Sequence, residues 1–166
     1  MKKILFIALM LLAGNHLPAQ TTYYRGEWSK AGSGERFTGL FAIRIKANGS
    51  VTGELLWKYL ACDSTDKFQL THYINKKGKT AIEIIDGTYD AERFEFAWRG
   101  TDKIDPYEII DTDRYTIKIS LDRKNIFGSS ASHGTNNGYF YGVKTDAIPA
   151  KNELDKARTL LKRKSK

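Results

Sequence analysis

Apolar and polar residues alternate along most of the chain, and this period of two predicts β-strands. In 41–45, Phe41, Ile43 and Ile45 share one face while Arg44 lies on the other. The same pattern recurs with aromatic residues in 94–98 and with aliphatic residues in 115–121. A shift of one residue would turn each apolar set toward water, so the strand register is strongly specified.

Turn-forming residues separate these segments, most clearly Asn48-Gly49, because Asn-Gly tolerates the positive φ angles of a tight hairpin turn. The predicted strands are 23–29, 36–46, 50–60, 67–75, 79–89, 92–99, 107–120, 125–132 and 138–144. Eight or nine sequential strands with short turns form an antiparallel meander, which avoids free edges by closing into a barrel or folding into a sandwich. We therefore expect one all-β domain over 21–149.

The last segment, 150–166, has a helical pattern instead. After Pro149, the sequence predicts a helix over 152–163, with Asn152 as its cap and Glu153 and Asp155 in its first turn. A narrow apolar stripe is formed by Leu154, Ala157, Leu160 and Leu161. Three turns are too few for a stable isolated helix, so docking on the barrel is the first interpretation of this basic segment. An anionic membrane surface and a protein partner are the alternatives.

Residues 1–20 have the pattern of a cleaved signal peptide, with Lys2 and Lys3 before the apolar run 4–12. We expect cleavage near Gln20 or Thr21 and a secreted or periplasmic protein. The single cysteine, Cys62, allows no intramolecular disulfide and is too far from the cleavage point to carry a lipoprotein anchor. Its expected environment is apolar, against Leu60 and Phe68.

The formal net charge of +8 does not describe the predicted barrel. The signal peptide removes two lysines, and 150–166 holds seven basic residues against two acidic ones. This leaves 21–149 at about +1, with 18 basic and 17 acidic residues. Because nucleic-acid binding needs a concentrated excess of positive charge, we expect no nucleic-acid partner.

Tyr24-Arg25-Gly26-Glu27-Trp28 places Gly-x-Trp on the first predicted strand, ahead of the meander and the helix. This arrangement resembles the calycin superfamily of lipocalins and avidins. The resemblance implies a calycin-like barrel with Gly26 and Trp28 closing one end and a basic side chain, here Lys144, over the tryptophan. It also implies an interior that holds a small apolar ligand or is filled by side chains. The candidate ligand-binding residues are Phe41, Leu55, Trp57, Phe94, Phe96, Trp98, Tyr115 and Ile117.

Signals for catalysis or metal binding are weak. His72 fits a core position, and His133 follows Ser130 and Ser132 in a polar segment that has no Gly-x-Ser-x-Gly motif. An acidic cluster lacks the glycine and closing glutamate of a calcium loop, which favours hydrated turn carboxylates: Asp102, Asp105, Glu108, Asp111 and Asp113. We therefore expect no metal site, no cofactor and no enzyme, with a hydrolase as the weaker hypothesis.

The function that the sequence favours is that of a non-catalytic β-barrel binding protein outside the cytoplasm, with a small apolar ligand. The alternative is a protein-interaction or inhibitor module of the cell envelope. Such a module would act through its loops or through the basic tail.

Overall fold

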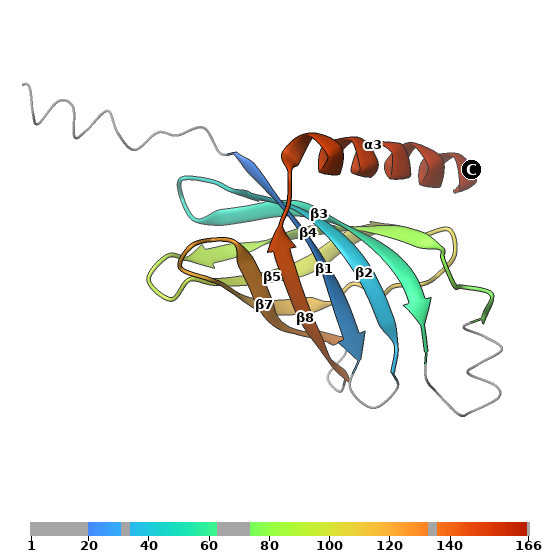
Figure 1. The fold of residues 1–166 in the computed structure, drawn as a ribbon, viewed down its shortest axis with the longest axis horizontal. Coiled ribbons are helices and arrows are strands. Elements are labelled where there is room, and N and C mark those ends of the chain that lie inside the picture. The colour runs from blue at the N-terminus through green and yellow to red at the C-terminus, as the bar shows by residue number, and fades with distance from the viewer. Residues whose placement is uncertain (1–19, 31–33, 63–73, 133–135, 166) are drawn as a thin grey trace, which may run out of the picture.

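The computed structural model describes residues 20–30, 34–62, 74–132 and 136–165. It is a closed antiparallel barrel in which each strand pairs with the next along the chain and the last pairs with the first. Figure 1 shows the barrel and the C-terminal helix lying across its outside. The strands are β1 (Thr21–Lys30), β2 (Arg36–Ile45), β3 (Ser50–Ala61), β4 (Thr80–Asp90), β5 (Glu95–Ile104), β6 (Arg114–Ile119), β7 (Asn125–Ser132) and β8 (Asn136–Lys144). The predicted meander and its closure into a barrel are confirmed.

The alternating pattern positions one side of each strand toward the barrel interior. On β3, Val51, Leu55, Trp57 and Tyr59 are buried in the inner core, as the period of two predicts. The predicted hairpin turn at Asn48-Gly49 is also present, with Gly49 at φ 79° and the Asn48 carboxamide oxygen accepting a hydrogen bond from the Ser50 amide.

A second apolar layer lies outside the barrel, under the helix α3 (Ala147–Lys164). Leu154 and Leu161 of α3 are buried against outward side chains of β2, β3 and β4, namely Leu40, Leu56 and Ile82. The docking of this helix is therefore confirmed. Its predicted start was wrong: α3 begins at Ala147 and not at 152, because proline is tolerated in a first turn, where Pro149 lies. Consequently, the first turn contains no acidic residue.

Two predicted strands begin later in the structure. The strand expected to begin at residue 92 is β5, which begins at Glu95. A turn precedes it, because the Asp90 carboxylate accepts hydrogen bonds from the amides of Glu92 and Arg93. The strand expected over 107–120 is shorter in the structure, where β6 begins at Arg114. The Asp105 carboxylate accepts hydrogen bonds from the amides of Tyr107 and Ile110, and these bonds hold the segment before β6 as a loop. Most of the predicted strand 67–75 lies outside the described residues, and its last two residues are not in a strand: Ile74 is helical and Asn75 lies in a turn.

Candidate ligand pocket at one end of the barrel

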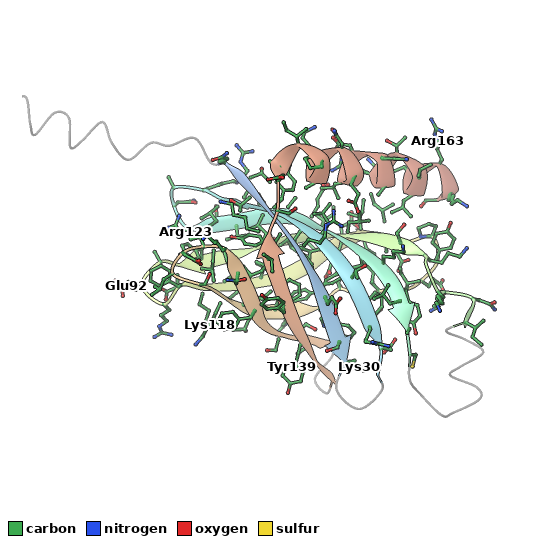
Figure 2. All side chains as sticks on the ribbon, viewed as in Figure 1. Lys30, Glu92, Lys118, Arg123, Tyr139 and Arg163 are labelled. Carbon is green, nitrogen blue, oxygen red and sulfur yellow. The ribbon has the colours of Figure 1, made fainter. Side chains whose placement is uncertain are left out.

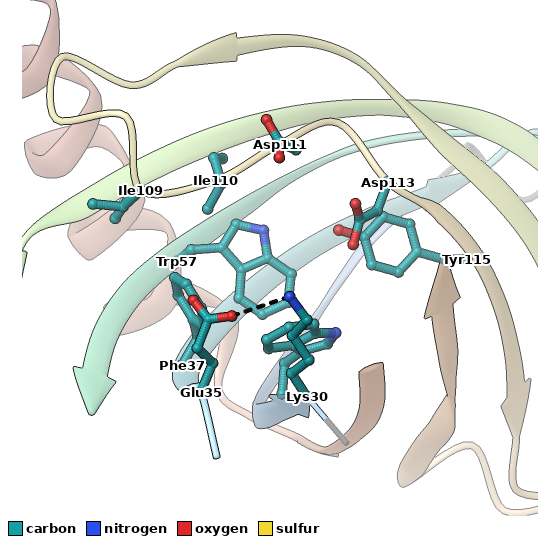
Figure 3. A pocket seen from close by; sticks show the side chains of 10 residues that line it. Lys30, Glu35, Phe37, Trp57, Ile109, Ile110, Asp111, Asp113 and Tyr115 are labelled. Carbon is teal, nitrogen blue, oxygen red and sulfur yellow. Dashed lines mark ion pairs between the residues drawn. The ribbon is translucent and has the colours of Figure 1, made fainter. Parts of the chain in front are cut away.

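A pocket of about 110 Å³ opens at the barrel end where β1 finishes and β2 begins. We call it the mouth pocket; Figure 3 shows its side chains. It is lined by Trp28, Lys30, Glu35, Phe37, Trp57, Ile109, Ile110, Asp111, Asp113 and Tyr115. The turns that join β2 to β3, β4 to β5 and β6 to β7 lie at the opposite end of the barrel.

Aromatic rings form one side of the mouth pocket. Trp28 meets Phe37 edge-on at 5.4 Å between ring centroids, and Phe37 meets Trp57 at 6.3 Å. Edge-to-face contacts of this kind are favourable and fix the orientation of each ring. The pocket therefore has a preorganised aromatic wall.

Charged groups line the rim, with three carboxylates and one ammonium. Lys30 lies 3.4 Å from Glu35, as Figure 3 shows, while Asp111 and Asp113 come from the β5–β6 loop. Asp111 is largely exposed, and its carboxylate lies 3.9 Å from the Lys103 ammonium. With Lys103 counted, three carboxylates stand against two ammonium groups, so the rim has an excess of one negative charge.

Hydrogen bonds hold the β5–β6 loop, which supplies Asp111 and Asp113, in place. The Asp105 side chain is fully buried, and it accepts a hydrogen bond of 2.9 Å from the Ile110 amide. The Lys103 ammonium donates a hydrogen bond of 2.5 Å to the Ile110 backbone carbonyl oxygen. The Lys76 ammonium donates one of 2.6 Å to the Glu108 backbone carbonyl oxygen. These contacts hold the loop over the barrel end.

Beneath the rim lies a buried carboxylate, Glu83 of β4. It accepts hydrogen bonds from Trp57 Nε1 at 3.0 Å, Tyr115 Oη at 2.7 Å and the Asp113 amide at 3.1 Å. Burial raises the pKa of Glu83 to about 7 despite these three donors, which oppose the shift. Because the donors all belong to residues that line the mouth pocket, Glu83 fixes its inner wall.

The predicted ligand-binding residues lie in three different places. Trp57 and Tyr115 line the mouth pocket. Five others lie fully buried in the inner core: Phe41, Leu55, Phe96, Trp98 and Ile117. Phe94 is partly buried in the turn before β5, with φ 52°. Phe41 packs against Trp57 at 5.0 Å and against Phe140 at 4.5 Å, so at this level side chains fill the barrel.

The Gly26-x-Trp28 motif has a clear structural role. A Cβ atom on Gly26 would lie 2.0 Å from the Tyr141 carbonyl oxygen, so this close pairing of β1 with β8 requires glycine. Trp28 Nε1 donates a hydrogen bond of 2.8 Å to Ser130 Oγ. Lys144 was expected over Trp28, but this prediction was wrong: the register places Lys144 opposite Tyr24, while Phe140 lies opposite Trp28.

The structure describes only some of the other candidates. His72 and His133 lie outside the described residues, as does the side chain of Ser132, while Ser130 is buried beside Trp28. Within the described parts of the chain, no three metal-ligating side chains come together. Cys62 is half-buried and packs against the inner core, but its expected neighbour Phe68 is not described.

Sequence reasoning missed Glu83, Lys30 and Glu35. A signal for Glu83 was present, because the period of two in 79–89 places it on the same face as Ala81 and Ile85. A glutamate among inward-facing residues points to a buried polar site. No comparable signal exists for Lys30 and Glu35, which the pairing of β1 with β2 brings together.

Comparison with models of known protein families found no match, and comparison with curated proteins found none either. Among the residues that the structure describes, no helix combines the length and apolar character needed to cross a membrane.

Proposed function

We propose that this protein is a non-catalytic binding protein of calycin-like type, exported from the cytoplasm, whose mouth pocket holds a small organic cation. The observation that carries the proposal is the combination of an aromatic wall with an acidic rim around one preformed pocket. A volume of about 110 Å³ fits a group of a few heavy atoms, with the remainder of the ligand reaching into solvent.

Electrostatics favour a cation over the purely apolar ligand expected from the sequence. Three carboxylates, those of Glu35, Asp111 and Asp113, face two ammonium groups, because Lys30 is paired with Glu35 and Lys103 lies 3.9 Å from Asp111. One negative charge is therefore left in excess. The faces of Trp28 and Trp57 add negative potential, which attracts cations within about 6 Å of the ring. An amine with an apolar body matches both the rim and the wall.

Binding without catalysis is supported by the surroundings of Glu83. A raised pKa marks a candidate for general acid–base chemistry. However, this carboxylate has no exposed surface and already accepts three hydrogen bonds. A general base must reach the proton that it removes. Glu83 therefore serves as a positioning residue for Trp57 and Tyr115.

The test is calorimetric titration and thermal shift with benzylamine, phenethylamine and tryptamine, against benzyl alcohol and phenylacetate as uncharged and anionic analogues. We expect only the amines to bind. A ligand at a hundred times its Kd should raise Tm by about 5–10 °C. The double substitution Asp111→Asn/Asp113→Asn should weaken binding about tenfold, whereas Glu92→Gln, in the turn before β5, should leave it unchanged (Figure 2). Equal binding of the amines and phenylacetate would refute the preference for a cation. Failure of every compound to bind would refute the proposal that the mouth pocket is a ligand site.

A second candidate is the protein-interaction module, with the basic tail as its contact. The docked helix leaves Lys156, Lys162, Arg163 and Lys164 exposed. This row of positive charge suits an acidic protein or an anionic membrane surface. Loss of partner capture on removing these four charges, with the barrel intact, would support that role.

A further inference from the structure

The outer face of β7 and β8 carries four large apolar side chains that remain exposed. These are Phe127 at 46%, Tyr139 at 60%, Tyr141 at 54% and Val143 at 43%. The register places Phe127 directly opposite Tyr141, while Tyr139, Tyr141 and Val143 occupy alternate positions of β8. Figure 2 shows Tyr139 projecting away from the barrel wall. The four form one continuous ridge on the outside of the barrel.

A groove of about 640 Å³ runs beside this ridge, and we call it the outer groove. Residues 25–29 of β1 form its floor, with Tyr139 and Tyr141 on one side and Arg36 and Thr38 on the other. Its floor extends about 13 Å along β1. This volume lies in the range of sites for small and medium ligands. Trp28 borders both the outer groove and the mouth pocket, but the groove lies along the outer wall and shares no other lining residue with the pocket at the barrel end.

The charges of the outer groove balance one another. Arg25 forms an ion pair of 2.5 Å with Glu153 of α3, and Glu27 offsets Arg36. On the far side of the ridge, Lys118 lies opposite Glu95. Around the aromatic rings lie the hydroxyl groups of Ser29, Thr38, Ser129 and the two tyrosines. The Tyr141 hydroxyl donates a hydrogen bond of 3.1 Å to Asn125 Oδ1 and keeps its oxygen as an acceptor. A ligand that complements this surface is neutral and rich in hydrogen-bonding groups.

We propose that the outer groove binds an uncharged oligosaccharide, with Tyr139 and Tyr141 stacking on its sugar rings. The two tyrosines are about 7 Å apart along β8, the spacing of alternate strand residues. The C–H edges of a sugar ring carry partial positive charge and are attracted to the negative face of an aromatic ring. The hydroxyl and charged side chains of the groove bind the sugar hydroxyls. Nucleic acid would need a local excess of positive charge, which this surface does not have.

The experiment is calorimetric titration of the full mature chain with neutral hexasaccharides: cellohexaose, xylohexaose, mannohexaose, maltohexaose and chitohexaose. We expect at least one to bind. Tyr139→Ala and Tyr141→Ala should each weaken binding about tenfold or more, while Tyr139→Phe, which keeps the ring, should stay within about threefold. Leu160→Ala, an exposed apolar residue of α3, is the matched control and should change nothing. The circular-dichroism spectrum and Tm of each variant exclude unfolding as the cause.

Three results would overturn the proposal. One is failure of all five hexasaccharides to bind. Another is binding that both alanine variants retain. The third is a concentration-dependent dimer in sedimentation velocity that the same variants disperse, which would make the ridge an interface between two copies of the chain. Asp111→Asn/Asp113→Asn, which alters the mouth pocket, should not change sugar binding. The two proposed sites are therefore tested independently.

Discussion

At the scale of single residues, the most unusual group is the buried carboxylate of Glu83. Desolvation favours its protonated form, and three hydrogen-bond donors favour the ionised form. Desolvation is the larger effect, so the pKa rises from its ordinary value of 4.5 to about 7. Between these two pH values the folded protein holds a proton that the unfolded chain has already lost. The contribution of Glu83 to the free energy of unfolding therefore falls as pH rises through this window.

We predict that Glu83→Gln gains stability relative to wild type as pH rises from 5 to 8. The glutamine stays neutral, so the difference in unfolding free energy should move by about 2–3 kcal/mol in favour of the variant. Urea denaturation at pH 5, 6, 7 and 8 measures this. Glu92→Gln, an exposed control, should differ from wild type by a constant amount. A constant difference for Glu83→Gln as well would refute the raised pKa.

The hydrogen bond from Trp28 Nε1 to Ser130 Oγ allows a second prediction at this scale. Ser130 is 1% exposed and Trp28 is half-buried, so removing either partner leaves the other without its hydrogen bond where access to water is restricted. Trp28→Phe and Ser130→Ala should each lower the free energy of unfolding by about 1–3 kcal/mol. The double variant should lose about 1 kcal/mol less free energy of unfolding than the sum of the two single losses. Full additivity in urea denaturation would mean that the bond contributes nothing.

At the scale of elements, α3 is held by an apolar contact and by ion pairs. Leu154 and Leu161 pack on β2–β4. Arg158 of α3 binds the carboxylate of Glu54 in β3, and Glu153 of α3 pairs with Arg25 in β1. Since the helix is docked, its two neighbouring leucines have different surroundings: Leu161 is 3% exposed and Leu160 is 49% exposed.

We predict that Leu161→Ala lowers the free energy of unfolding by about 2–4 kcal/mol, because it leaves a cavity between α3 and the barrel. Leu160→Ala makes the same chemical change on the solvent side and should cost less than about 1 kcal/mol. Thermal and urea denaturation compare the pair directly. Similar losses for both variants would contradict the docking of α3 through Leu161.

The sequence predicted the elements whose signals are local. Alternation placed the core face of β3, and Asn48-Gly49 marked its turn, because both depend on neighbouring residues. The start of β6 was wrong, since the Asp105 carboxylate binds amides up to five positions away, and apolar periodicity gives no sign of such a bond. The helix start was wrong because Pro149, taken as a stop for the β part, lies in the first turn of α3.

The candidate pocket was less predictable than the fold. Trp57 and Tyr115 were named from their alternating positions, and both line the mouth pocket. Periodicity identifies residues that face inward, but it does not tell which level of a barrel is filled and which is open. Phe41 and Phe96 face inward and lie in packed core, whereas Trp57 lies where the packing ends. That distinction depends on the loops that cover each end.

At the scale of the whole molecule, closure explains how a domain without a disulfide is held together. The pairing of β1 with β8 removes the free strand edges at which barrels would otherwise associate. Apolar side chains are buried on two levels, inside the barrel and beneath α3. The two proposed ligand sites lie at the barrel end and on the outer wall, where aromatic rings and charged groups border a pocket and a groove.

The order of the chain also makes a prediction about export. β1 begins at Thr21, and its first residue pairs with Arg44 of β2, so cleavage near Gln20 or Thr21 leaves the barrel complete. We predict that the chain, produced in a Gram-negative host, is recovered from the periplasm or the medium. Its intact mass should equal that of a chain beginning at residue 20 or 21. Leu9→Asp interrupts the apolar run of the signal and should leave a full-length protein in the cytoplasm. Full-length wild-type protein in the cytoplasm would contradict export. A mature chain that starts beyond residue 24 would also contradict the prediction, because it would lack the residues that pair the start of β1 with β2.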